Sequence, residues 1–205
     1  MTKARWVQVL LVLAAVLWWW SGRPDGETVD AAIDWSREPL QTATDHAPIH
    51  VTTRRGEATL TPRAAYDIAA RVEGAERYRF DDTAILSPLD LVLTWGELPL
   101  PEWREKLDYS QSWRFYFWRT ADLSLDAEYV IRHSANTHII PANRNLERAL
   151  LTVGAGDDVR LTGYLVDSSA PGFRWETSLV RSDHGDHGCE VLYVESAQIG
   201  DRLYR

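Results

Sequence analysis

The sequence predicts a mainly β fold with short helices (α+β), either a small OB-like barrel or a sandwich, preceded by one N-terminal transmembrane helix. Two observations carry this prediction. An apolar run, Trp6–Trp20, opens the chain. After it, alternating or aromatic-rich segments recur between turn residues, as in strand-rich domains. We therefore expect a membrane anchor (residues 1–22), a linker (23–48) and an extracytoplasmic globular domain (49–205).

The N-terminal segment has the pattern of an uncleaved anchor. Lys3 and Arg5 precede an apolar run whose one polar side chain is Gln8. The run ends at residues 18–20, all Trp, where signal cleavage would require small residues. Residues 4–22 reach the roughly 20 residues that a spanning helix needs. Positive charges stay in the cytoplasm, so we expect a single-pass protein of the inner membrane with its bulk in the periplasm. A cleaved signal and a buried N-terminal helix are the alternatives.

Charge and cysteine content exclude some functions. The chain has 22 Lys and Arg against 30 Asp and Glu, a net charge of −8. Residues 1–20 hold two of the basic residues and none of the acidic ones, so the remainder carries −10. Such a surface argues against nucleic acid as a partner, because that binding rests on Lys and Arg. Cys189 is the chain's one cysteine. It can form no intrachain disulfide, and we expect it to be a small buried hydrophobe.

The segments after the N-terminal anchor predict a linker and then strands. Residues 23–48 are rich in Asp, Glu, Thr, Pro and Gly without an apolar period, which indicates a linker. His50–Thr61 alternates weakly and passes Gly56, which predicts a hairpin. Tyr66–Glu73 alternates apolar and polar residues, which predicts a strand, although its alanines also suit a helix.

Four segments predict helices. Ser87 followed by Pro88 has the pattern of a capped helix start, so we expect a helix that ends at Trp95-Gly96. Pro101–Leu107 predicts a second short helix. Ser124–His133 predicts a third, capped by its first residue. Asn143–Leu151 predicts a fourth.

The remaining segments predict strands. Ser112–Arg119 is aromatic-rich, and its apolar residues fall on both faces, so we expect a strand packed on both sides. Val159–Val166 predicts a strand that bends at Gly163. Residues 174–181 and 190–195 predict a hairpin. From about Gly156 onward, the order of strands and bends resembles small closed barrels such as the OB-fold, as an analogy of shape.

Three motifs together resemble a group of bacterial membrane-anchored proteins for which no activity is known. They are Leu86-Ser-Pro-Leu-Asp90 with Trp95-Gly96, Ser134-Ala-Asn-Thr-His138 with Pro141-Ala142, and Gly163-Tyr-Leu-Val166 with Trp175, Arg181, Asp183 and Cys189-Glu190. The resemblance covers roughly residues 50–195. It implies an N-terminal anchor and an extracytoplasmic domain, and it implies no catalytic residue and no cofactor.

The segment His133–Pro141 is the first candidate site. A hydrolase would use His138 as the base, Ser134 as the nucleophile and Asn136 as an oxyanion donor, because imidazole titrates near neutrality. No G-x-S-x-G motif and no assignable acid accompany them. The alternative is a polar loop whose Ser and Asn side chains bond local backbone, and we favour it.

The segment Asp183–Cys189 is the second candidate. Asp183, His184, Asp186 and His187 are ligand types for zinc or another divalent ion. A Gly-rich solvated turn explains them equally well and no distant ligand is evident, so we expect no metal and no cofactor. His187 and Cys189 are also the residue types of a base and a thiol nucleophile.

A dense group of aromatic residues is the third candidate. Its members are Trp95, Trp103, Trp113, Phe115, Tyr116, Phe117 and Trp118. Rings offer flat area for stacking a sugar or a peptide. The alternative, which we favour, is that they form the domain core.

Function is therefore predicted only by class. The leading hypothesis is a membrane-tethered extracytoplasmic binding or assembly module of a bacterial envelope system, with an envelope protein as its partner. The alternative is a membrane-anchored hydrolase or metal-dependent enzyme that uses the His133–His138 and Asp183–Cys189 segments. A cleft that holds both segments would favour the enzyme, and an aromatic surface would favour the binding module.

Overall fold

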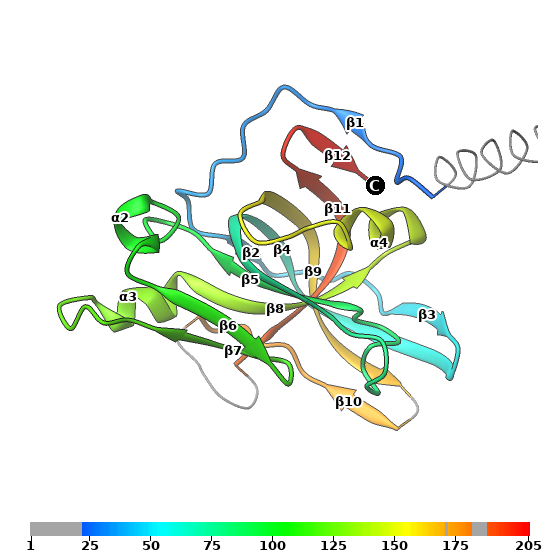
Figure 1. The fold of residues 1–205 in the computed structure, drawn as a ribbon. Helices are drawn as coiled ribbons and strands as arrows, with labels where there is room; N and C mark the ends of the chain where they lie inside the picture. The colour runs from blue at the N-terminus through cyan, green and yellow to red at the C-terminus, as the bar shows by residue number, and fades with distance from the viewer. Residues whose placement is uncertain (1–21, 171, 182–187) are drawn as a thin grey trace, which may run out of the picture.

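The computed structural model describes residues 22–170, 172–181 and 188–205 (Figure 1). Most of these residues lie in strands. The helices among them are short: α2 (Pro101–Arg104), α3 (Ala127–Arg132) and α4 (Arg144–Leu150). The prediction of a mainly β fold with short helices is confirmed. None of the described helices is long and apolar enough to cross a membrane.

Strand β4 (Gly56–Arg77) organises the sheet. Its buried residues alternate with more exposed ones, and they are Ala58, Leu60, Ala64, Tyr66, Ile68, Ala70 and Val72. Register shifts at Pro62–Ala64 and Val72–Gly74 interrupt its ladders, as β-bulges that bend a strand do. Strand β3 (Ile49–Thr53) pairs with its start. The predicted hairpin around Gly56 and the predicted strand over Tyr66–Glu73 are both confirmed.

Five strands pair along a path that returns to β4. After β4 come β5 (Leu89–Thr94), β8 (Ser134–Pro141), β11 (Glu190–Ile199) and β9 (Asp158–Ala170), which pairs with β4 again. The β8–β11 pair is parallel and the other four are antiparallel. Helix α4 connects β8 to β9. The helix predicted over Asn143–Leu151 is confirmed, and the Asn143 side chain caps it by accepting from the N–H groups of Asn145 and Leu146.

Strands β5 and β8 each present one face to the main core and one to the opposite side. The residues that they place in the main core are Leu89, Leu91, Leu93, Ala135 and Ile139. Successive strand residues point to opposite faces. The polar residues Asp90, Asn136 and His138 therefore share the face that lies away from the main core.

That outer face is covered by the excursion between β5 and β8. Its central part is the aromatic hairpin, defined as β6 (Asp108–Ser112) and β7 (Phe115–Arg119), which pair with each other. Helices α2 and α3 flank it, and Leu98, Leu107 and Val130 form a small core of their own. The predicted helices at Pro101 and within Ser124–His133 are both present but shorter. The predicted cap was wrong, because Asp126 caps α3 and Ser124 instead bonds Asp122.

Two other predictions were wrong in this region. The segment after Ser87 is strand β5 and no helix, because every residue of Leu89–Thr94 is buried, as in a strand covered on both faces. The segment Ser112–Arg119 is no strand packed on both sides. It contains the hairpin turn and the edge strand β7, whose alternate residues Phe115 and Phe117 are exposed.

The C-terminal hairpin was also predicted wrongly. Residues 173–175 form β10, which pairs with β9, while β11 pairs with β8 and β9. The segment 23–48, expected to be a linker, contributes two short strands. Strand β1 (Glu27–Thr28) pairs with β12 (Arg202–Tyr204), and β2 (Leu40–Thr42) pairs with β4.

Gly163 lies in the antiparallel pairing of β9 with β11, opposite Val194. We predict that this position tolerates no side chain. A Cβ atom there would lie 1.9 Å from the Tyr193 carbonyl oxygen. Gly163→Ala should cost about 3 kcal/mol or more of unfolding free energy, the upper range for overpacking. Gly154→Ala is the matched control, since its Cβ would meet nothing within 4 Å, and it should change stability by about 1 kcal/mol at most. Denaturant unfolding of the full chain in neutral detergent measures both, and equal effects would contradict this packing.

Candidate functional site

The tip of the aromatic hairpin has an unusual backbone. The two turn residues are Trp113 and Arg114, and both have left-handed φ values, 56° and 70°. Two-residue hairpin turns favour this conformation, but they normally use Asn or Gly there because a Cβ atom is unfavourable at positive φ. The two side chains at this turn therefore call for an explanation.

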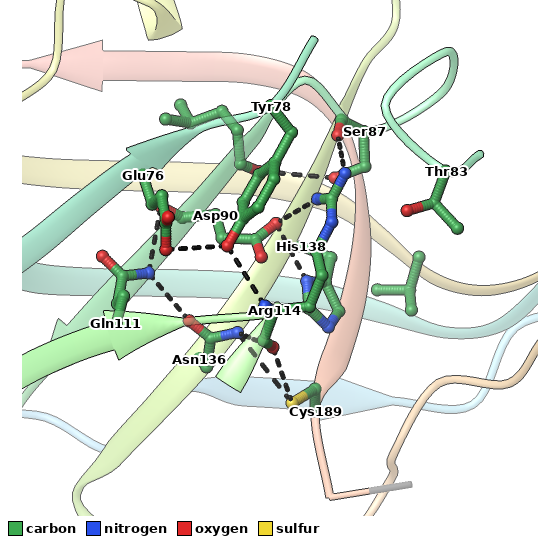
Figure 2. Close-up of polar contacts among 12 residues, drawn as sticks. Glu76, Tyr78, Thr83, Ser87, Asp90, Gln111, Arg114, Asn136, His138 and Cys189 are labelled. Atoms are coloured by element: carbon green, nitrogen blue, oxygen red, sulfur yellow. Dashed lines mark hydrogen bonds and ion pairs between the residues drawn. The ribbon is translucent and has the colours of Figure 1, made fainter. Parts of the chain in front are cut away.

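Arg114 is explained by the contacts of its side chain (Figure 2). One guanidinium nitrogen donates to Asp90 Oδ1 at 2.7 Å. The other donates to both carboxylate oxygens of Asp81, at 2.8 and 3.0 Å, and to the Ser87 carbonyl at 3.0 Å. The guanidinium also lies 3.6 Å from the centre of the Tyr78 ring. Arg114 thus joins the hairpin tip to β5 and to the loop between β4 and β5.

Asp90 has a second partner, His138. The two residues are direct neighbours across the β5–β8 ladder, and His138 Nδ1 lies 2.9 Å from Asp90 Oδ1. Both side chains are buried, with 0 % of Asp90 and 3 % of His138 exposed. The ring of Trp175, from β10, covers the imidazole at 4.3 Å between ring centres. A carboxylate buried this completely is stable only when it is paired.

Asn136 fixes the backbone of the hairpin tip. Its amide nitrogen donates to the Arg114 carbonyl at 2.9 Å and lies 3.9 Å from the sulfur of Cys189. Its oxygen accepts from Gln111 at 3.0 Å. The tip is therefore held through both its side chain and its main chain.

The cluster also shifts the pKa values of its members. Burial acts to raise the pKa of Asp81, but the hydrogen bonds from Arg114 and Thr83 outweigh it, so the pKa lies below its ordinary value. Burial, the hydrogen bond to Glu76 and the charge of Asp90 all raise the pKa of Tyr78. Asp81 therefore stays ionised and Tyr78 stays neutral at physiological pH.

The structure separates Ser134 from His138. They lie four residues apart on one strand, about 13 Å at the usual rise. The Ser134 hydroxyl donates to the Val130 carbonyl at 2.7 Å and lies 3.0 Å from the Tyr116 hydroxyl. A nucleophile must lie within hydrogen-bond reach of its base. The candidate grouping of Ser134, Asn136 and His138 thus forms no hydrolytic set, although His138 has an acidic neighbour in Asp90. The favoured interpretation as a polar loop was wrong, because the segment is the buried strand β8.

Most of the second candidate segment lies outside the residues that the structure describes. Asp183, His184, Asp186 and His187 fall in residues 182–187, which the structure leaves undescribed. Cys189 is described and half-buried beside Asn136. In the described residues, no group of three or more His, Cys, Asp or Glu side chains could hold a metal ion.

The aromatic residues divide between core and surface. Trp95 is buried in the main core. Trp113, Phe117 and Phe115 are exposed, to 85 %, 54 % and 37 %. A cavity of about 330 Å³ runs along β7. Its apolar lining includes Tyr116, Trp118, Ile131, Ala135 and Val180, and its polar lining includes Ser134, Arg181 and Glu190. The aromatic surface that would favour a binding module is therefore present on the hairpin.

Sequence reasoning missed Arg114 and Asp90. Nothing local distinguishes Arg114 from other arginines of an aromatic strand, and Asp90 lies in the segment after Ser87 that was predicted to be a helix. Their relation depends on a contact across 24 positions of sequence. Comparison with protein-family models, curated proteins and solved structures finds no match. The resemblance stated above stays a prediction.

Asp81 makes the docking of the hairpin sensitive to acid. Its pKa is depressed below the ordinary 3.8, so its contribution to stability is complete above that pH and is lost as pH falls through the folded-state pKa. Asp81→Asn should cost about 1 kcal/mol at pH 7, because the carboxylate is part-exposed. The difference from wild type should shrink below pH 3.8. Unfolding curves of both proteins between neutral and acid pH measure this, and a difference that persists into acid would contradict the assignment.

Proposed function

We propose that this chain is a membrane-tethered, extracytoplasmic binding or assembly module of a bacterial envelope system, which binds a protein partner through its aromatic hairpin. The observation that carries the proposal is the exposed Trp113 at a strained, firmly held turn. A Trp side chain with 85 % exposure stabilises its own fold very little. Its left-handed backbone costs free energy that Gly would avoid. Contact with another molecule explains why such a residue stands there.

The surface beside Trp113 suits an extended protein segment. In the described part of the chain, β7 pairs on one side only, with β6, and the 330 Å³ cavity lies along it. Extended peptides bind by adding a strand to an unpaired edge and placing a side chain in a neighbouring pocket. The apolar part of the cavity wall fits an aliphatic or aromatic side chain. Trp and Tyr also dominate the binding energy at protein interfaces.

The buried cluster supports binding over catalysis. Asp90 and His138 have the residue types of an acid–base pair, but Arg114 and Trp175 cover them. Arg114 is engaged by two carboxylates, a carbonyl and an aromatic ring. These groups hold the hairpin in place, and a substrate would have to displace it to reach them.

The strand order supports the finer prediction of an OB-like fold. The path β4–β5–β8–β11–β9–β4, with its parallel β8–β11 pair and a helix between β8 and β9, matches the order of a five-stranded Greek-key OB arrangement. In that arrangement, ligands bind on the face of the second and third strands. Here these strands are β5 and β8, and the aromatic hairpin lies on that face. The proposed partner therefore contacts the hairpin and not the strands beneath it.

The tether is proposed from the N-terminal sequence. Lys3, Arg5 and the Trp residues at 18–20 support an anchor in the inner membrane. The acidic body argues against nucleic acid as a partner.

Trp113→Gly separates binding from stability. Gly suits the left-handed turn, so the variant should be as stable as wild type or more stable by about 1 kcal/mol. Its contact with the partner should be lost. The measurement is crosslinking in cells, from a photoreactive amino acid at Phe117, followed by identification of the adduct by mass spectrometry.

We expect one envelope protein to be captured from Phe117, and at least tenfold less of it when Trp113→Gly is also present. The control position is Arg37, which is 84 % exposed and lies outside the hairpin. Equal capture from both positions, or capture that is unaffected by Trp113→Gly, would refute the proposed surface.

A further inference from the structure

A second cleft of the molecule concentrates positive charge on an acidic protein. Its volume is about 780 Å³, and it is lined by Arg54, Arg55, Arg77 and Arg79. The chain as a whole carries −8. Four guanidinium groups around one cleft therefore form a local concentration of positive charge on a chain whose net charge is negative.

The course of β4 brings these arginines together. Arg54 and Arg55 form the turn before β4, and Arg77 is its last residue, with Arg79 two positions beyond. Two bulges interrupt β4, and residues at or next to both of its ends line one cleft. An ion pair of 2.5 Å between Arg55 and Asp82 joins the two segments.

The four arginines do not all have acidic partners. Arg77 donates to the carbonyl oxygens of Leu151 and Val153, which carry no full charge. Arg54 and Arg79 are exposed and make no hydrogen bond or ion pair with any described residue. Of the lining acids, Asp81 is engaged by Arg114, which leaves Glu147. After these pairings the cleft keeps a surplus of about two positive charges.

We propose that this cleft binds a phosphomonoester group, gripped between Arg54 and Arg79. A phosphomonoester carries about −1.5 to −2 at pH 7, which matches the surplus charge. Its three free oxygens let two guanidinium forks bind from opposite sides, whereas one fork satisfies a carboxylate. Phe80, which is 94 % exposed, and Ile85 add an apolar wall beside the arginines. A phosphomonoester lipid headgroup and inorganic phosphate both offer this dianionic phosphoryl chemistry.

The first test is a calorimetric titration of the full chain, in neutral detergent, with inorganic phosphate. Wild type should bind one phosphate, and more weakly as salt rises. Arg54→Gln and Arg79→Gln should each weaken binding about tenfold. Arg119→Gln, which removes the same charge from an exposed site outside the cleft, should leave binding unchanged. Thermal midpoints without phosphate should be equal in all four proteins, which shows that the folds are intact.

A second titration identifies the source of the phosphoryl group. Short-chain phosphatidic acid should bind more tightly than inorganic phosphate if the natural ligand is a lipid, and Phe80→Ala should remove the difference. Equal affinities that do not depend on Phe80 indicate a free phosphate ligand. Absence of saturable phosphate binding, or binding that neither Arg54→Gln nor Arg79→Gln weakens, overturns the proposal. The cleft adjoins the hairpin tip through Tyr78 and Asp81, but Arg54 and Arg79 lie outside the hairpin, so either proposal can fail alone.

Discussion

The buried carboxylate of Asp90 is the constraint on which the outer half of this molecule depends. A fully buried carboxylate needs compensation, and the neighbouring strand β8 supplies only part of it, through His138. The remainder comes from Arg114, at the far end of an excursion of the chain. The pairing therefore places the aromatic hairpin on the sheet, and with it the exposed surface of Trp113 and Phe117.

The same pairing explains why an unfavourable turn persists. A type of turn that prefers Asn or Gly is held here by an arginine whose side chain and carbonyl are both bonded to the sheet. The contacts of Arg114 offset the cost of its left-handed backbone, and its neighbour Trp113 is carried along with its side chain in solvent. Strain at one end of the hairpin and presentation of an aromatic surface are thus consequences of one interaction.

Local pattern in the sequence was enough for much of the architecture. The alternation over Tyr66–Glu73, the turn at Gly56 and the helix over Asn143–Leu151 were predicted from neighbouring residues, and the structure confirms them. The helix predicted after Ser87 was wrong. The prediction rested on a local helix-start pattern, whereas burial on both faces makes Leu89–Thr94 a strand. The site was less predictable still. His138 was singled out for its chemistry, but strand pairing brings it to Asp90, and a long excursion brings Arg114 to the same carboxylate, which no local pattern encodes.

Hydrogen exchange of the backbone amides tests most directly whether Arg114 holds the hairpin on the sheet. The full chain should be compared with Arg114→Lys, which keeps the charge but loses the planar fork that reaches two carboxylates. If Arg114 holds the hairpin, amides of β6 and β7 should exchange about tenfold faster or more in the variant, because the hairpin opens as a local unit. Amides of the β4–β9 ladder should hardly change. Unchanged exchange in the hairpin, or an equal increase throughout the sheet, would contradict this role of Arg114.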